Sequence, residues 1–181
     1  MLIRILIGLA VVGAALVIFI AMQPADFRVA RTATVNAPAS EVFAQVNDFR
    51  KWVVWSPFEK LDPAMKKSYS GSPGGEGAVY AWSGNDKAGE GRTTIVETRP
   101  GQMIRMTLEF TRPFKANNEV IFTFVPEGDR TSVTWAMTGH RDFMFKAVGL
   151  LMNMDKTVGG EFEKGLADLK SVSELSTQSS S

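Results

Sequence analysis

The sequence has no cysteine and only one histidine in 181 residues. Without cysteine the chain cannot form a disulfide, a thiolate nucleophile, a cysteine metal site or a lipoprotein anchor. A metal site would depend largely on carboxylates, so we predict no metal and no cofactor. An excess of one charge is also missing, because 20 Lys and Arg balance 19 Asp and Glu. This balance gives no positive field for nucleic acid, which we exclude as a partner.

Charge is almost absent from residues 2–22, where Arg4 is the only charged residue. The eighteen residues from Ile5 to Met22 are uncharged and mostly apolar, and as a helix they would come close to spanning the ~30 Å hydrocarbon core. A cleavable signal peptide normally has a shorter apolar region that ends in small residues, and neither Ala21 nor Ala25 completes a good site. We therefore expect an uncleaved anchor, with a signal peptide and a buried core helix as the alternatives.

The anchor determines how the rest of the chain is divided. Arg4 and the terminal amine precede the apolar run while Arg28 and Arg31 follow it, and we favour a single pass through a bacterial cytoplasmic membrane with the domain outside. The 148 residues between anchor and tail are enough for one core. The predicted parts are an anchor at 1–22, a linker at 23–26, one domain at 27–170 and a disordered polar tail at 171–181.

Alternating apolar and polar residues predict strands along most of the domain. Phe27, Val29, Ala33 and Val35 share one face of a first strand, and Pro38 then precedes a short helix. Turn residues recur at short intervals from Met65 onward, which favours an antiparallel sheet with one wet face. We predict six more strands, near 65–70, 78–83, 89–98, 102–111, 117–125 and 130–138.

The end of the domain has a helical period instead. Apolar residues fall three or four positions apart and predict one long amphipathic helix, along Phe143, Ala147, Leu151, Met154, Val158, Phe162, Leu166 and Leu169. Gly159, Gly160 and Gly165 each lower helix propensity by up to ~1 kcal/mol, so packing must hold the helix. These small residues either let the helix approach the sheet or mark a kink.

Four stretches carry a resemblance to a known family: N-A-P-A-S-E-V-F at 36–43, D-F-R-K-W-V-V-W-S-P at 48–57, G-x-G-A-V-Y-A-W-S-G-N at 75–85 and G-G-E-F-E-K-G-L-A-D-L-K at 159–170. From about Phe27 to Lys170 the chain resembles the START-like, or SRPBCC, superfamily, and within it the polyketide cyclase/dehydrase-like proteins. The resemblance implies an α+β helix-grip fold, in which a curved seven-stranded antiparallel sheet wraps round a long C-terminal helix. It also implies a hydrophobic ligand held between the sheet and that helix.

Aromatic and methionine side chains are the candidate lining of this cavity. Trp52 and Trp55 lie where the family shapes the cavity rim, although a hydrophobic plug explains them as well. Met144 and Met152 lie near the terminal helix and would make the lining adaptable. The other candidates are Tyr80, Trp82, Met106, Leu108, Phe122, Phe124, Trp135, Met137 and Met154. A filled core would have the same composition, so the sequence leaves a hollow and a solid interior open.

Polar candidates for catalysis are few. His140 could act as a general base, but an exposed turn histidine is the explanation we favour, and the neighbouring Asp142 could equally well cap a helix. Glu109 could reach the cavity, but we expect it to pair with Arg92 across the sheet, as Glu97 would with Arg105. Glu90 and Asp86 could form a carboxylate pair, although nothing in their spacing is diagnostic.

Three functions fit these observations. The first is a membrane-anchored domain that binds a small hydrophobic or lipid-like molecule without covalent chemistry. The second is an enzyme of cyclase or dehydrase type in which His140 or Glu109 moves a proton. The third is a tethered interaction module without a ligand. The sequence does not identify the ligand or the oligomeric state.

Overall fold

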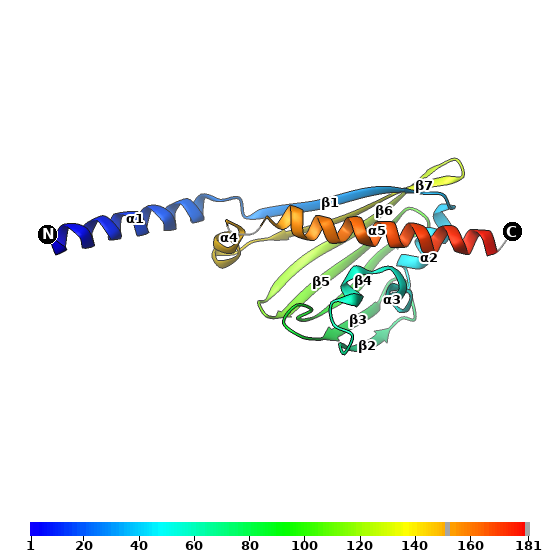
Figure 1. Cartoon of the computed structure of the whole chain (residues 1–181). Helices are drawn as coiled ribbons and strands as arrows, with labels where there is room; N and C mark the ends of the chain where they lie inside the picture. The colour runs from blue at the N-terminus through cyan, green and yellow to red at the C-terminus, as the bar shows by residue number, and fades with distance from the viewer. Residues whose placement is uncertain (151–152, 180–181) are drawn as a thin grey trace.

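The computed structural model describes residues 1–150 and 153–179 of the chain. An apolar N-terminal helix projects from a domain built of a sheet and short and long helices (Figure 1). The elements are α1 (Leu2–Met22), β1 (Asp26–Val35), α2 (Ala39–Val46), the 3-10 turn η1 (Phe49–Lys51), α3 (Trp52–Trp55), the 3-10 turn η2 (Pro57–Lys60), β2 (Lys66–Gly71), β3 (Ala78–Ser83), β4 (Glu90–Arg99), β5 (Met103–Arg112), β6 (Ala116–Glu127), β7 (Arg130–His140), α4 (Phe143–Gly149) and α5 (Met154–Ser179).

The seven strands form one antiparallel sheet in the order β1-β7-β6-β5-β4-β3-β2. Consecutive strands from β2 to β7 are neighbours, whereas β1 pairs with β7 at the opposite edge, with Asp26 opposite His140 and Val35 opposite Thr131. The sheet curves beneath α5, which runs alongside β1 (Figure 1). This is the helix-grip arrangement, and the predicted fold class and all seven predicted strands are confirmed.

The hydrophobic core lies between the concave face of the sheet and α5. Alternate residues of the strands point inward, so Ile104 and Met106 on β5 are fully buried. Phe162, Leu166 and Leu169 of α5 are spaced three or four apart and are at most 2% exposed. Burying a side chain of this size contributes roughly 1.5–3 kcal/mol, which holds α5 on the sheet in spite of its glycines.

An ion-pair cluster fixes the first turns of α5 to β1. The guanidinium of Arg31 donates to Glu163 Oε1 at 2.6 Å, to both carboxylate oxygens of Asp155 at 3.0 Å and to the Asp155 carbonyl at 3.0 Å. The hydrogen bonds from Arg31 hold the pKa of Asp155 below its ordinary value. Gly159 lies directly beneath this guanidinium, since a Cβ there would come within 2.1 Å of Arg31 Nη2.

The terminal region differs from the single predicted helix, because α4 and α5 are separate. Gly149 ends α4, and the Asn153 side chain accepts a hydrogen bond from the backbone N–H of Lys156 at 3.0 Å, which starts α5. Both signals lie inside the apolar period that predicted one helix. Leu151 and Met152, which were part of that prediction, lie outside the described residues.

The predicted disordered tail at 171–181 is wrong for residues 171–179, which form the last turns of α5. Val172 packs against the core, Ser173 is fully buried, and Glu174 Oε1 accepts a hydrogen bond from the backbone N–H of Asn36 at 2.8 Å. These contacts hold a polar segment in place that composition alone describes as a tail. Residues 180 and 181 lie outside the described residues.

Candidate binding pocket

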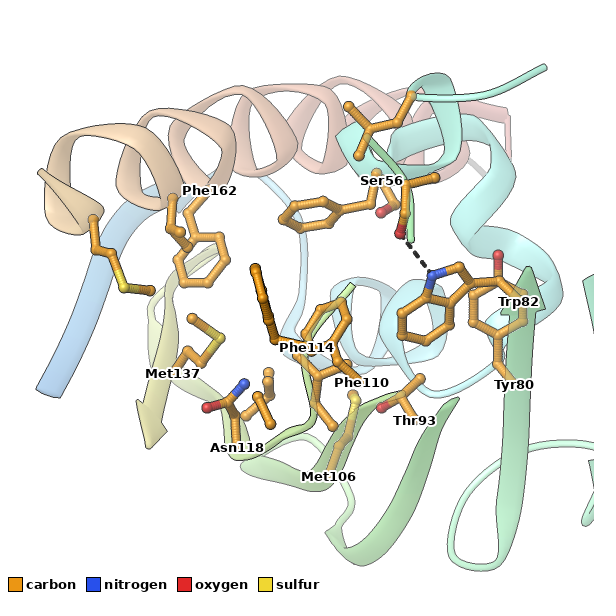
Figure 2. Close-up of a pocket in the computed structure, with 18 of the residues that line it drawn as sticks. Ser56, Tyr80, Trp82, Thr93, Met106, Phe110, Phe114, Asn118, Met137 and Phe162 are labelled. Carbon is orange, nitrogen blue, oxygen red and sulfur yellow. Dashed lines mark hydrogen bonds between the residues drawn. The ribbon is translucent and has the colours of Figure 1, made fainter. Parts of the chain in front are cut away.

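The concave face of the sheet encloses a pocket of about 370 Å³. Strands β1 and β3 to β7 supply one wall, and α3, η2, α4 and the first half of α5 supply the other. Figure 2 shows Met106, Met137 and Phe162 directed into this space from β5, β7 and α5. The wall is mostly apolar, and the volume lies in the range of roughly 300–1,000 Å³ that is typical of small-molecule sites.

Eight of the eleven predicted cavity residues line the pocket, namely Trp52, Tyr80, Trp82, Met106, Leu108, Trp135, Met137 and Met154. The other three, Trp55, Phe122 and Phe124, do not line it and are at most 2% exposed in the solid part of the core. The strand alternation therefore predicted the correct face of the sheet. The alternation does not show how far the cavity extends along each strand.

The end of the core next to α2 and α3 is filled by aromatic rings. Trp55 lies edge-on to Phe122 with the ring centres 6.1 Å apart, and Phe124 lies edge-on to Phe43 of α2 at 5.6 Å. The indole N–H groups of Trp52 and Trp55 donate to the carbonyls of Val46 and Gln45, at 3.0 and 3.2 Å. Trp55 is thus part of a hydrophobic plug, while Trp52 belongs to both plug and pocket wall. The interior is solid at this end and hollow towards α4.

A buried carboxylate in the pocket wall was missed by the sequence reasoning. The side chain of Glu59 on η2 is 4% exposed; its Oε1 accepts a hydrogen bond from the Tyr80 hydroxyl at 2.5 Å and its Oε2 accepts one from Lys67. Burial, and then the hydrogen bond to Glu59, raise the pKa of Tyr80 well above its ordinary value, so this phenol stays protonated. Glu59 sits in the short stretch P-F-E-K beside a turn, which in sequence is indistinguishable from a surface position.

Three more polar atoms of pocket-lining residues are buried without a partner. Among the described residues, Ser56 Oγ, Trp135 Nε1 and Arg141 Nε have no hydrogen-bond partner. Buried polar groups are normally paired, and an unpaired one costs roughly 1–3 kcal/mol. Together with Tyr80 and Glu59, these atoms offer a bound molecule a few hydrogen-bonding points on a mostly apolar wall.

His140 lies at the α4 end of the pocket and is largely exposed. Its side chain is 71% exposed and its Nδ1 is 2.9 Å from Asp26 Oδ1. Asp142 caps α4, accepting a hydrogen bond from the backbone N–H of Phe145 at 2.8 Å, as predicted. His140 is therefore exposed, at the end of β7 rather than in a turn, and its partner Asp26 is 92% exposed as well.

The predicted ion pairs lie across β4 and β5. Arg92 is opposite Glu109 and binds it, and Arg105 is opposite Glu97 and binds it. The hydrogen bond from Arg105 lowers the pKa of Glu97. Glu109 does not line the pocket, which removes the geometric basis for a catalytic role.

The remaining acidic candidates do not converge on the pocket either. Glu90 Oε2 accepts a hydrogen bond from the Ser83 hydroxyl at 3.1 Å, and Asp86 is exposed. Neither residue lines the pocket. In the described part of the chain, no three His, Asp or Glu side chains are grouped so that they could hold a metal ion.

A family model matches the part of the chain that forms the sheet and the pocket. Residues 26–174 match the family model described as polyketide cyclase / dehydrase and lipid transport. The chain belongs to this family. The match covers the whole sheet and α5 up to Glu174, and it leaves out α1.

Solved structures share the fold at low identity. Proteins from Chromobacterium violaceum and Thermus thermophilus superpose with TM-scores of 0.59 each, at 15% and 16% identity, covering 84% and 83% of this chain and 99% of each of their own. Truncated norcoclaurine synthase from Thalictrum flavum superposes with a TM-score of 0.57 at 12% identity, covering 81% of this chain and 92% of its own. At these identities the likeness shows the fold alone. No curated protein matches the sequence.

Proposed function

We propose that this member of the family is a membrane-anchored domain that binds a small hydrophobic or lipid-like molecule between the sheet and the terminal helices. The observation that carries the proposal is the pocket itself, which has a volume of about 370 Å³ and a mostly apolar wall. An unfilled apolar space of this size loses packing contacts, so a domain gains stability when an apolar molecule occupies it. The family description, which includes lipid transport, supports the same reading.

The polar atoms in the wall restrict the chemistry of the ligand. A molecule that fills the space needs an apolar body against Met106, Leu108 and Met137, and one polar group near Glu59 and Tyr80. A carboxylate oxygen can accept more than one hydrogen bond, so Glu59 favours a hydroxyl or another donor over a second carboxylate, which has no proton to donate. We therefore propose a neutral amphipathic ligand with a hydroxyl-type polar end.

The membrane part of the proposal rests on α1. Its 20 residues from Leu2 to Ala21 are long and apolar enough to cross a bilayer once, and they are exposed apart from Ile20. A signal sequence near the N-terminus would pass the same test. An anchor would hold the pocket beside a reservoir of apolar ligand, with the domain outside the cytoplasmic membrane as the proposed orientation.

Native mass spectrometry of the full chain, followed by organic extraction, tests the pocket. The wild type should carry an apolar molecule at a fixed stoichiometry, and Leu108→Trp should lose it because the indole fills the space. Glu109→Gln is the matched control, since Glu109 is the next residue of β5 but does not line the pocket. Equal retention in the wild type and in a folded Leu108→Trp would show that the ligand lies elsewhere.

Proton-transfer catalysis is the second candidate, and the buried Glu59 with Tyr80 favours it. A carboxylate at 4% exposure beside a phenol can exchange a proton with a bound molecule. These two residues replace His140 and Glu109 as the catalytic candidates. Conversion of the extracted ligand by wild type, lost in Glu59→Gln and kept in His140→Ala, would establish this role. The hollow pocket speaks against the third function, a tethered module without a ligand.

A further inference from the structure

Helix α4 is apolar on every side, although it is a short surface helix. Its seven residues are F-M-F-K-A-V-G, with Lys146 as the only charge. None of them is buried, and Phe143, Met144 and Val148 are 48%, 59% and 38% exposed. A helix that is apolar all round is normally covered by protein or by lipid. The described residues of this chain leave much of α4 uncovered.

The inner side of α4 closes one end of the pocket. Phe145 lines the pocket and meets Phe114 of the β5–β6 connection edge-on, with the ring centres 5.8 Å apart. Phe114 lines the pocket too, yet it is 54% exposed. The same apolar surface is therefore pocket wall on its inner side and open on its outer side. We call Phe114, Phe143, Met144, Val148 and Leu150 the α4 face.

The α4 face is continuous with α1. Lys146 Nζ donates to the Ala21 carbonyl at 3.1 Å, and Ile20, in the last turn of α1, is buried. Only residues 23–25 separate α1 from β1, and the distance from Met22 to Asp26 is at most about 14 Å. Figure 1 shows α4 at the end of the domain from which α1 projects. Whatever surface receives α1 must lie close to α4.

The charges around the α4 face suit an anionic surface. Segments 26–28, 112–117 and 140–150 each contribute to the pocket wall next to α4, and they carry two acidic residues, Asp26 and Asp142. Their basic residues are Arg28, Arg112, Lys115, Arg141 and Lys146. Apolar side chains flanked by Lys and Arg are the composition with which interfacial helices bind anionic lipid surfaces.

We propose that the α4 face docks on the lipid surface of the membrane that holds α1, so that the pocket opens towards the bilayer. The proposal rests on the proposed anchor and goes beyond it, because an anchor alone leaves the orientation of the domain undefined. In this arrangement Phe143, Met144 and Val148 of the α4 face contact an anionic lipid bilayer. A ligand then enters past Phe114 and Phe145 from the lipid without crossing water.

Quenching of a protein-bound fluorophore by nitroxide-labelled lipids tests the docking. The full chain has no cysteine, so a single introduced cysteine carries an environment-sensitive fluorophore at a unique position. The protein is reconstituted in vesicles of phosphatidylcholine and phosphatidylglycerol, with part of the phosphatidylcholine carrying a nitroxide on its acyl chain. The labelled positions are Met144 in the α4 face, Val11 in α1, and Val125, which lies on β6 near its hairpin to β7 and is 51% exposed.

We expect strong quenching at Met144 and Val11 and little at Val125. Replacing Phe143 and Val148 by Asp should lower the quenching at Met144 to the level of Val125, without changing Val11. Quenching at Val11 but not at Met144 overturns the docking and leaves the anchor intact. Absence of quenching at Val11 overturns the anchor and the docking together. Cross-linking between Met144→Cys chains without lipid quenching would assign the α4 face to a second copy and also overturn the docking.

Discussion

Tyr80 lines the apolar pocket and also contacts the carboxylate of Glu59. Its ring stacks on Tyr69 and Trp82 with centres 5.3 and 5.8 Å apart, and its hydroxyl donates to Glu59. Glu59 is in turn neutralised by Lys67 from the exposed edge strand β2. One side of this chain of contacts faces the pocket, and the other reaches the surface through Lys67.

The protonation of Tyr80 should be visible in an alkaline titration. Both tyrosines of the chain have a raised pKa, mainly through burial, and Tyr80 has the larger shift because it also donates to Glu59. Tyr69→Phe, which leaves Tyr80, should therefore ionise at a higher pH than Tyr80→Phe, as measured by the ultraviolet absorbance of tyrosinate. Ionisation of Tyr80 near the ordinary value of 10.0 in folded protein would contradict the hydrogen bond to Glu59.

The sign of the linked effect on stability follows from the same shift. A group whose folded pKa is raised keeps its stabilising effect below its unfolded pKa and loses it as the pH rises towards the folded value. Stability should therefore fall as the pH rises above about 10, and less steeply in Tyr80→Phe than in the wild type. Thermal unfolding at several alkaline pH values measures the difference.

The sequence predicted which strand residues face the interior, but it did not predict the cluster of Glu59, Tyr80 and Lys67. Alternation placed Tyr80, Met106 and Trp135 on the inner face, because a strand directs every second side chain the same way. Glu59 is buried by β2 and β3, which follow it in the chain, and local composition carries no sign of that. Buried charge depends on the tertiary fold, so a sequence motif of four residues does not predict it.

At the scale of elements, α5 shows what its glycines do. A Cβ on Gly165 would lie 2.7 Å from Trp135 Cζ3 and 2.9 Å from Pro57 Cδ, so this glycine lets the helix lie close to the pocket wall. Gly160 faces open space, with nothing within 4 Å of the same position. Of the two roles the sequence allowed, close approach to the sheet applies to Gly165, and Gly160 has no packing role.

These two glycines make a matched pair for mutation. Gly165→Ala should destabilise the domain by about 1–3 kcal/mol through overpacking against Trp135 and Pro57. Gly160→Ala should stabilise it by up to about 1 kcal/mol, since alanine is the better helix former. Urea denaturation followed by tryptophan fluorescence gives both values. Equal effects of the two substitutions would mean that α5 does not approach the sheet at Gly165.

Helix ends were the least predictable part of the elements. The apolar period runs through Gly149 and Asn153, so it joined α4 to α5, although these residues supply an ending and a cap. The period also fades after Leu169, yet α5 continues because Val172, Ser173 and Glu174 have tertiary contacts. The spacing of apolar residues reveals the buried face of a helix. Capping residues and individual tertiary contacts determine where the helix ends.

At the scale of the whole molecule, the domain has a solid end and a hollow end. The aromatic plug of Trp55, Phe122 and Phe124 fills the end beneath α2 and α3, and the pocket lies towards α4 and α1. The family resemblance predicted a cavity between sheet and helix. It did not predict which end of the domain is solid and which is hollow. That difference depends on where large side chains occur along the inward-facing side of each strand.

Attachment to the membrane gives a prediction for the whole chain. If α1 is an uncleaved anchor, the protein should stay in the membrane fraction after an alkaline carbonate wash, with peptides from residues 1–22 still present. Replacing Leu9 and Ala10 by Arg should move it to the soluble fraction, because charges at the centre of a span are strongly disfavoured. Arg28→Ala, outside α1, is the control and should leave the protein in the membrane. Recovery of a mature chain that lacks residues 1–22 would support a signal sequence instead.

The pairing of β1 with β7 has a consequence for biosynthesis. Among the described strands, β1 is an edge strand whose one neighbour, β7, begins at Arg130, after the other five strands. At about 5–20 residues per second, β7 leaves the ribosome roughly 5–20 s after β1. During that interval β1 has no hydrogen-bonded neighbour from its own sheet. The domain therefore closes late, when β7 and then α5 reach the first strand and bury it from two sides.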